Sequence, residues 1–211
     1  MTQRIQQIKD IIVQRSIMRL VHFTRVENLA SIMQNGIVPI ANARVKELTP
    51  AINDTIRLDG YTNASCLSIT FPNHLMFYKY RQENPHVNWV VLWIDPSILW
   101  LKNCAFCRHN AADARIRSQL LNSMQTPASL SGMFDEIEGV TSRQEQRLLA
   151  CDTSDVQAEV LVFDVIEPQY ISRAAFNNQE TKDSSMEFLG GRQTKLNPVN
   201  GGSFATRSFV R

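Results

Sequence analysis

The chain has 211 residues, a formal net charge of +2, 44% hydrophobic residues and 20% charged residues. This composition is typical of one globular domain with a sizeable core, and so small a net charge does not by itself indicate a nucleic-acid partner. No apolar run approaches the roughly 18 residues of a membrane span, and no signal peptide precedes the first helix, so we expect a cytoplasmic protein.

The N-terminal part predicts a helix, a strand and a second helix. Isoleucines at helical spacing mark the helix over 3–15, and the strand covers 18–23. A capping box at Thr24–Glu27 starts the next helix, which ends before Gly36. His22 therefore lies at a strand end beside a helix N-terminus, which suits a phosphate or carboxamide ligand. The alternative is a buried histidine with a purely structural hydrogen bond.

A long irregular segment follows and leads into the centre of the chain. Residues 41–64 have no clean periodicity and predict a loop, and long ordered loops are often functional lids. Arg57 lies within it. The next predicted elements are a strand over 65–71, a short helix over 74–82 and a very hydrophobic, central strand over 89–94.

The four cysteines are too sparse for a disulfide scaffold. Cys104 and Cys107, with His109 nearby, match half of a zinc site or a redox pair, but the sequence offers no second pair of ligands. We therefore expect buried, reduced cysteines and no metal, with a structural zinc site as the alternative.

The segment from 103 to 151 is helical or irregular and carries several arginines. Arg115, Arg117, Arg143 and Arg147 are candidates for guiding a nucleic-acid backbone. The alternative is the solvated face of one or more helices.

A short strand rich in β-branched residues is predicted over 156–163. Side chains alternate along a strand, so Gln157 and Glu159 share one face while the valines and Ala158 share the other. Glu159 is either a strand-edge carboxylate in water or a catalytic carboxylate next to an orienting amide, because a buried carboxylate needs a reason to be there. A last strand at Tyr170–Ile171 completes the predicted sheet.

The composition changes towards the C-terminus. From 177 onward polar residues dominate and apolar residues are sparse. We therefore predict a domain over 1–176 and a C-terminal extension over 177–211 that is mobile or becomes ordered on a partner.

Several of these residues together, in their order and spacing, resemble one protein family. They are His22, Thr24, Asn28 and Gly36, then Arg57, then the segment from Ser68 to Tyr78, and finally Gln157 and Glu159. The pattern resembles the DarT family of ADP-ribosyltransferases, which attach ADP-ribose from NAD to DNA bases, and it covers residues 16–172.

The resemblance implies a role for each matching residue. His22, Thr24, Asn28, Ser68 and Gln157 would contribute to binding NAD. Gly36 would let the backbone approach the cofactor and Tyr78 would stack on nicotinamide. Glu159 would be the catalytic glutamate and Arg57 an active-site arginine.

The resemblance also implies a fold, a substrate and partners. The fold is α+β and ADP-ribosyltransferase-like, with two packed, mostly antiparallel sheets, a central NAD cleft and peripheral helices. Single-stranded DNA is the expected acceptor, and a cognate antitoxin that removes ADP-ribose from DNA is the expected partner.

One departure concerns the target base. Where the thymine-modifying branch of the family has a strongly aromatic strand, this chain has Cys66–Phe71, which favours guanine over thymine. The remaining alternatives are an ADP-ribosyltransferase that acts on protein or RNA, and a non-catalytic nucleic-acid-binding module.

Overall fold

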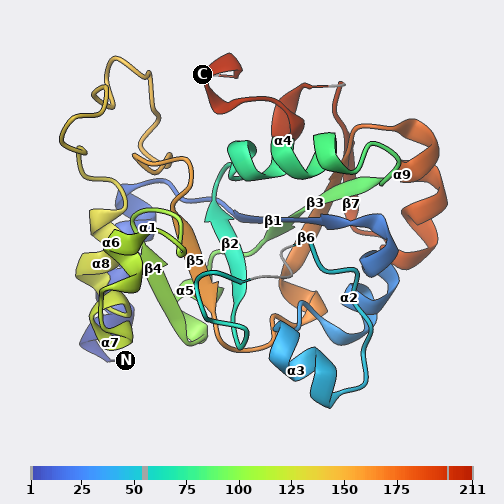
Figure 1. Ribbon diagram of the computed structural model, residues 1–211, viewed down its shortest axis with the longest axis horizontal. Coiled ribbons are helices and arrows are strands. Elements are labelled where there is room, and N and C mark those ends of the chain that lie inside the picture. Colours follow the sequence, from blue (N-terminus) through green and yellow to red (C-terminus); the bar gives the residue numbers. More distant parts are fainter. Residues whose placement is uncertain (1, 54–56, 199, 211) are drawn as a thin grey trace.

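The computed structural model describes residues 2–53, 57–198 and 200–210. Within these ranges seven strands form one sheet in the order β4-β5-β2-β1-β3-β6-β7, and all neighbouring pairs are antiparallel except β6 and β7. Figure 1 shows the sheet running through the middle of the molecule. The strands are β1 (Leu20–Arg25), β2 (Ser65–Ile69), β3 (Trp89–Ile94), β4 (Cys104–Cys107), β5 (Glu159–Val162), β6 (Ile171–Phe176) and β7 (Gln193–Leu196).

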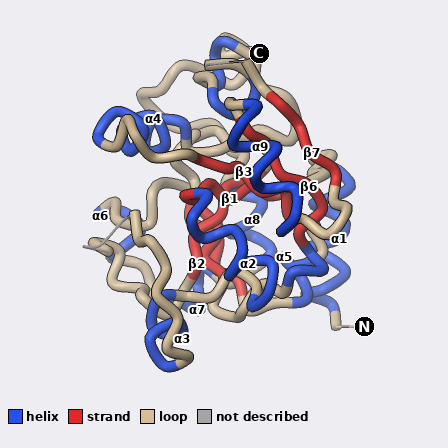
Figure 2. The backbone as a smooth tube through the Cα atoms, turned by 90° about the vertical axis from the view of Figure 1, so that its right-hand side faces the viewer, coloured by secondary structure: helices blue, strands red, loops and turns tan. Residues whose placement is uncertain are grey.

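The α-helices lie around this sheet, and the two chain ends lie on opposite sides of the molecule (Figures 1 and 2). No helix in the described ranges is both long enough and apolar enough to cross a membrane. The helices are α1 (Gln3–Gln14), α2 (Leu29–Asn35), α3 (Ile40–Val45), α4 (His74–Glu83), α5 (Ile98–Leu101), α6 (Ala114–Arg117), α7 (Leu121–Met124), α8 (Pro127–Gly132) and α9 (Gln179–Ser185).

The sheet is divided at the contact between β1 and β2. These strands pair only at Leu20 with Ile69 and at Val21 with Ser68, whereas β1 pairs with β3 along its whole length. Beyond Val21 the two strands separate, and a cleft opens between the halves β1-β3-β6-β7 and β2-β5-β4. The prediction of a mostly antiparallel α+β fold is confirmed, although the two expected sheets are joined into one by this short pairing.

Both faces of the sheet are covered, as the alternation of side chains along its strands requires. Leu20 on one face belongs to the largest hydrophobic cluster, which also includes Ile8 of α1. Val21 on the other face packs in a second cluster with Phe77 of α4. The two faces of this central strand therefore pack against different hydrophobic clusters.

The C-terminal segment is part of the sheet and differs from the predicted extension. Residues after 176 form α9 and then β7, which pairs in parallel with β6. Phe204 is 1% exposed and packs against Phe77 with the rings tilted, at 5.3 Å between ring centroids. The proposed boundary at 176 falls between two paired strands. The polar composition was misleading because β7 is an edge strand whose side chains are largely exposed.

Three further local predictions differ from the structure. The strand predicted over 156–163 begins only at Glu159, because residues 153–158 form a turn held by Asp155. The capping box is not formed, since Thr24 still belongs to β1 and a 3₁₀ helix begins at Val26. The predicted loop over 41–64 starts with α3, and its residues 54–56 lie outside the described ranges.

Candidate active site

One cleft collects most of the predicted site residues from both halves of the sheet. It is lined from the first half by His22 and Thr24 and from the second by Glu159. The other predicted residues that line it are Asn28, Gly36, Arg57 and Ser68. Residues distant in sequence thus share one cavity because β1 and β2 separate there.

Glu159 is the first residue of β5 and is 5% exposed. One carboxylate oxygen accepts a hydrogen bond from the side-chain amide of Asn110 at 3.2 Å, and the other accepts one from the backbone N–H of Ala111 at 2.9 Å. The predicted alternation holds within β5, where Val160 and Val162 lie in the hydrophobic core with Ala158, but not for Val156 and Gln157, which lie in the preceding turn. Glu159 is therefore a buried, oriented carboxylate and not a solvated strand edge.

His22 bridges the two halves of the sheet at the point where they separate. Its Nδ1 lies 2.9 Å from the carbonyl oxygen of Cys66 on β2. A carbonyl only accepts hydrogen bonds, so Nδ1 carries the proton and Nε2 is an acceptor in the neutral ring. Burial lowers the pKa of His22, and the hydrogen bond to Cys66 offsets only part of this effect. The ring is neutral at neutral pH.

Thr24 and Asn28 line the cleft but already hold each other and the adjoining loop. The Asn28 side-chain amide donates to the Thr24 hydroxyl at 2.9 Å and to the Ala51 carbonyl at 3.0 Å, while its own oxygen accepts from the Ala51 N–H at 2.7 Å. Asn28 therefore fixes the loop after α3, which forms one wall of the cleft through Pro50, Ala51 and Ile52.

Arg57 is held within its own loop. Its guanidinium makes two hydrogen bonds to Asp59, at 3.0 Å and 2.8 Å, and also donates to the backbone carbonyls of Tyr61 and Ala64. The exposed fractions of the two charged side chains are 8% and 6%. Arg57 thus closes the loop onto the start of β2 and presents one side of a fixed positive charge to the cleft.

The backbone at position 36 requires glycine and accepts no other residue type. Its φ is +82°, and a Cβ at this position would lie 2.4 Å from the Ile166 carbonyl oxygen. Ser68 organises the opposite wall, because its hydroxyl accepts from the backbone N–H of Asn73, the N-cap of α4. The side-chain amide nitrogen of Asn73 is buried beside the cleft and has no hydrogen-bond partner among the described residues.

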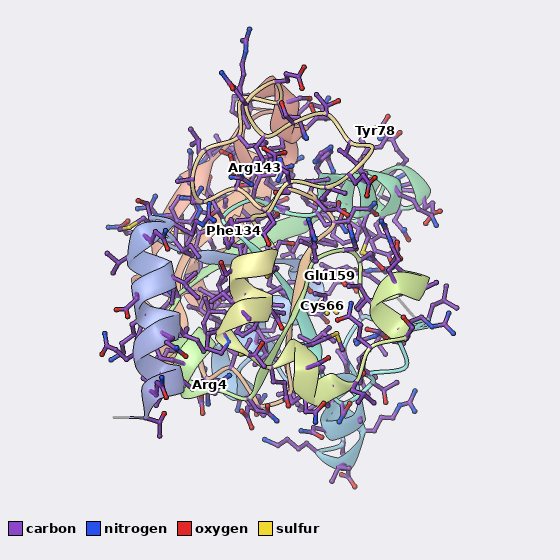
Figure 3. All side chains as sticks on the ribbon, turned by 90° about the vertical axis from the view of Figure 1, so that its left-hand side faces the viewer. Arg4, Cys66, Tyr78, Phe134, Arg143 and Glu159 are labelled. Atoms are coloured by element: carbon purple, nitrogen blue, oxygen red, sulfur yellow. The ribbon has the colours of Figure 1, made fainter. Side chains whose placement is uncertain are left out.

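Two predicted cofactor residues lie outside the cleft. Tyr78 is 52% exposed and does not line it, whereas Tyr80 and Met76 of the same helix do. Figure 3 shows Tyr78 at the outer edge of the molecule. Gln157 lies in the turn before β5 and does not line the cleft either. Helical spacing could have indicated Tyr80 as the cleft residue, since Met76 and Tyr80 are four residues apart and share a face of α4.

The four arginines that were predicted to contact nucleic acid lie in different environments. Arg115 and Arg117 are exposed on α6, just after the cleft residue Ala112, and Arg115 is paired with Asp113. Arg147 is exposed in a loop. Arg143 instead donates to the carbonyls of Leu149 and Asp152 and to the Ser154 hydroxyl, so its role is to hold this loop together.

The cysteine pair has a geometry unsuited to a shared metal ion. Cys104 and Cys107 lie on opposite faces of β4, in two different hydrophobic clusters. Burial raises the pKa of both thiols to about 12. His109 pairs with Asp155 at 2.7 Å and not with either cysteine. In the described ranges no three His, Cys, Asp or Glu residues are grouped as metal ligands.

The fold is shared with solved structures of low sequence identity. The chain superimposes on Thermosipho africanus DarTG in complex with ADP-ribose with a TM-score of 0.55 and 14% identity, covering 86% of this chain but only 50% of that one. For Thermus sp. 2.9 DarT in complex with NAD+ the TM-score is 0.55, the identity 12% and the coverage 86% of this chain and 96% of that one.

The same Thermus protein in complex with ADP-ribosylated ssDNA matches with a TM-score of 0.54 and 12% identity, over 86% of this chain and 95% of that one. No curated protein sequence matches the chain. The fold is thus that of the DarT ADP-ribosyltransferases. A family model described as "ssDNA thymidine ADP-ribosyltransferase, DarT" matches residues 21–203, and the chain belongs to this family.

The lowered pKa of His22 predicts an acid-sensitive fold. The unfolded chain protonates this ring at an ordinary pKa near 6.5, above that of the native state, so stability is complete above that pH and decreases as the pH falls from it towards the native pKa. We expect His22→Gln to flatten the dependence of the denaturation midpoint between about pH 7.5 and 5.5. An unchanged slope in the variant would contradict this role. Exposed His86→Gln is the control.

Proposed function

We propose that this chain transfers ADP-ribose from NAD to a base of single-stranded DNA, with guanine preferred over thymine. The observation that carries the proposal is the meeting of Glu159 and His22, from separate halves of the sheet, in one cleft. Family membership supports the reaction class. The Thermus and Thermosipho structures, whose ligands are NAD+, ADP-ribosylated ssDNA and ADP-ribose, support the substrates.

The side chains around the cleft fit the chemistry of NAD. Neutral His22 offers Nε2 as an acceptor for a ribose hydroxyl. Tyr80 and Met76 supply a flat, apolar wall suited to nicotinamide. The unpartnered amide nitrogen of Asn73 is a donor suited to a carboxamide or phosphate oxygen. Asn28 and Arg57 act in this proposal mainly by shaping the loop that covers the dinucleotide.

The reaction breaks the bond between ribose C1′ and the nicotinamide nitrogen and forms a bond between C1′ and a base nitrogen. Positive charge develops on the ribose as nicotinamide leaves, and the Glu159 carboxylate stabilises it. Asn110 and Ala111 hold that carboxylate in place before substrate arrives. The base nitrogen loses its proton during the attack, and the Glu159 carboxylate, which lines the cleft, is proposed to accept it.

The acceptor strand is proposed to enter beside α6. Arg115, Arg117 and Arg147 are exposed and are proposed to contact its phosphates, whereas Arg143 holds its own loop. A base has to leave any stack to enter such a cleft, which favours single strands. Modified bases would block copying of DNA. We further propose a toxin role in the cytoplasm, with a cognate antitoxin that removes ADP-ribose. The chain spans half the length of the DarTG chain it matches.

The direct test incubates the protein with NAD and single-stranded oligonucleotides that each lack one base, followed by mass spectrometry. We expect more added ADP-ribose mass on strands that contain guanine than on guanine-free strands. The preference for guanine rests on β2, because this strand lacks the aromatic run of the thymine-modifying branch. Equal or stronger labelling of guanine-free, thymine-containing strands would contradict the preference for guanine. Labelling of an added protein mixture without any DNA labelling would reject DNA as the acceptor.

Replacing the proposed catalytic carboxylate tests its role. Glu159→Gln keeps the size and one acceptor oxygen but removes the negative charge, so the transfer rate should fall by about 10²–10³ while the fold is retained. The measurement is the initial rate of oligonucleotide labelling, with the exposed Glu138→Gln variant as control. A rate for Glu159→Gln equal to that of the control would refute the assignment.

The two tyrosines of α4 form a matched pair. Tyr80→Ala removes a ring that lines the cleft and should raise the KM for NAD by about tenfold, the value of one aromatic contact of roughly 1 kcal/mol or slightly more. Tyr78→Ala should leave this KM unchanged, because its half-exposed ring lies outside the cleft. The opposite ranking in steady-state NAD kinetics would show that the original prediction of Tyr78 was right.

A further inference from the structure

The C-terminal residues contact two elements that support the active-site cleft, α4 and the turn before β5. Phe204 packs on Phe77 of α4, and its carbonyl oxygen accepts a hydrogen bond from Arg81 at 2.8 Å. Since α4 contributes Met76 and Tyr80 to the cleft, the chain near Phe204 is anchored directly behind a wall of the site. Figure 1 shows the C-terminal end lying beside α4.

Three residues further on, Arg207 reaches the turn that precedes β5. Its side chain is buried, with 6% of the residue exposed, and it donates to the carbonyl oxygen of Thr153 at 2.7 Å and to that of Ser154 at 3.5 Å. A guanidinium keeps its charge in proteins, so burying it is costly unless acceptors are provided. The turn provides them.

The Thr153–Asp155 turn also holds the segment that orients Glu159. Within it the Thr153 hydroxyl donates to the Asp155 carbonyl at 2.7 Å. The Asp155 carboxylate binds His109 at 2.7 Å and also accepts the Gln157 N–H at 2.8 Å. His109 directly precedes Asn110 and Ala111, the two donors to Glu159.

We propose that Arg207 is a positioning residue of the transfer reaction. It fixes the Thr153–Asp155 turn, and through the Asp155–His109 pair it holds Asn110 and Ala111 where they orient the Glu159 carboxylate. Arg207 lies beyond residue 203, where the match to the family model ends. The kinetic part of the inference rests on the proposed function.

The inference predicts a specific kinetic pattern. The hydrogen bonds of Arg207 go to the turn before β5, on the Glu159 side of the cleft, so its loss should lower kcat by a much larger factor than it changes the KM for NAD. A misplacement on the order of 1 Å at a reacting group is enough to lower a rate by about 10²-fold. Well below the melting temperature almost all molecules of a destabilised variant stay folded, so destabilisation alone would leave kcat unchanged.

The experiment compares Arg207→Ala and Arg207→Lys with Arg192→Ala. Arg192 is the matched control, because its guanidinium also donates to backbone carbonyls, those of Pro168, Ile171 and Leu189, and none of these residues lines the cleft. We expect kcat to fall by roughly 10²-fold in Arg207→Ala, to recover partly in Arg207→Lys and to stay within about threefold of wild type in Arg192→Ala.

Hydrogen exchange provides a second readout that does not depend on activity. The Ala111 amide, which donates to Glu159, should exchange faster in Arg207→Ala and Arg207→Lys than in wild type, and at the wild-type rate in Arg192→Ala. If Arg207→Ala does not fold, the lysine variant carries both measurements. Unchanged kcat with unchanged Ala111 exchange overturns the inference. A wild-type protein without transferase activity rejects the proposed function instead, and exchange at Ala111 then decides the positioning role alone.

Discussion

The separation of β1 from β2 after two residue pairs is the constraint on which the rest of the structure depends. A continuous antiparallel ladder would close the space between the two halves of the sheet, and no cleft would exist there. The short pairing keeps the halves attached, and the hydrogen bond from His22 to the Cys66 carbonyl spans the opening just beyond it. Both sides of the cleft are therefore built on strands, which position side chains more rigidly than loops do.

Many polar groups around the cleft serve to fix its shape. The side-chain amide of Asn28 hydrogen-bonds to Thr24 and Ala51. The guanidinium of Arg57 hydrogen-bonds to Asp59 and to the backbone that follows it. Because buried polar groups have to be hydrogen-bonded, these contacts hold the loop after α3 against the core. The loop can then cover a ligand without being ordered at that moment, which lowers the entropic cost of binding.

Hydrogen bonds also fix the position of the Glu159 carboxylate. Glu159 is buried, and both of its oxygens accept hydrogen bonds from N–H groups of the segment that starts at His109. That segment depends on the turn before β5, and the turn is held by Arg143 on one side and Arg207 on the other. Two guanidinium groups that do not line the cleft therefore hold the turn that leads into β5, and the C-terminal residues are part of the folded unit.

The sequence by itself determined the side-chain alternation along β5 and the helix end at Gly36, because these follow from local periodicity and backbone geometry, and the α+β class followed from the resemblance to the DarT family. Only the tertiary structure decided which tyrosine of α4 faces the cleft, where the Arg143 side chain points and that the polar C-terminus supplies an edge strand and Arg207. These depend on contacts between residues far apart in the chain. Side-chain direction and long-range pairing are set by packing, which residue spacing alone does not encode.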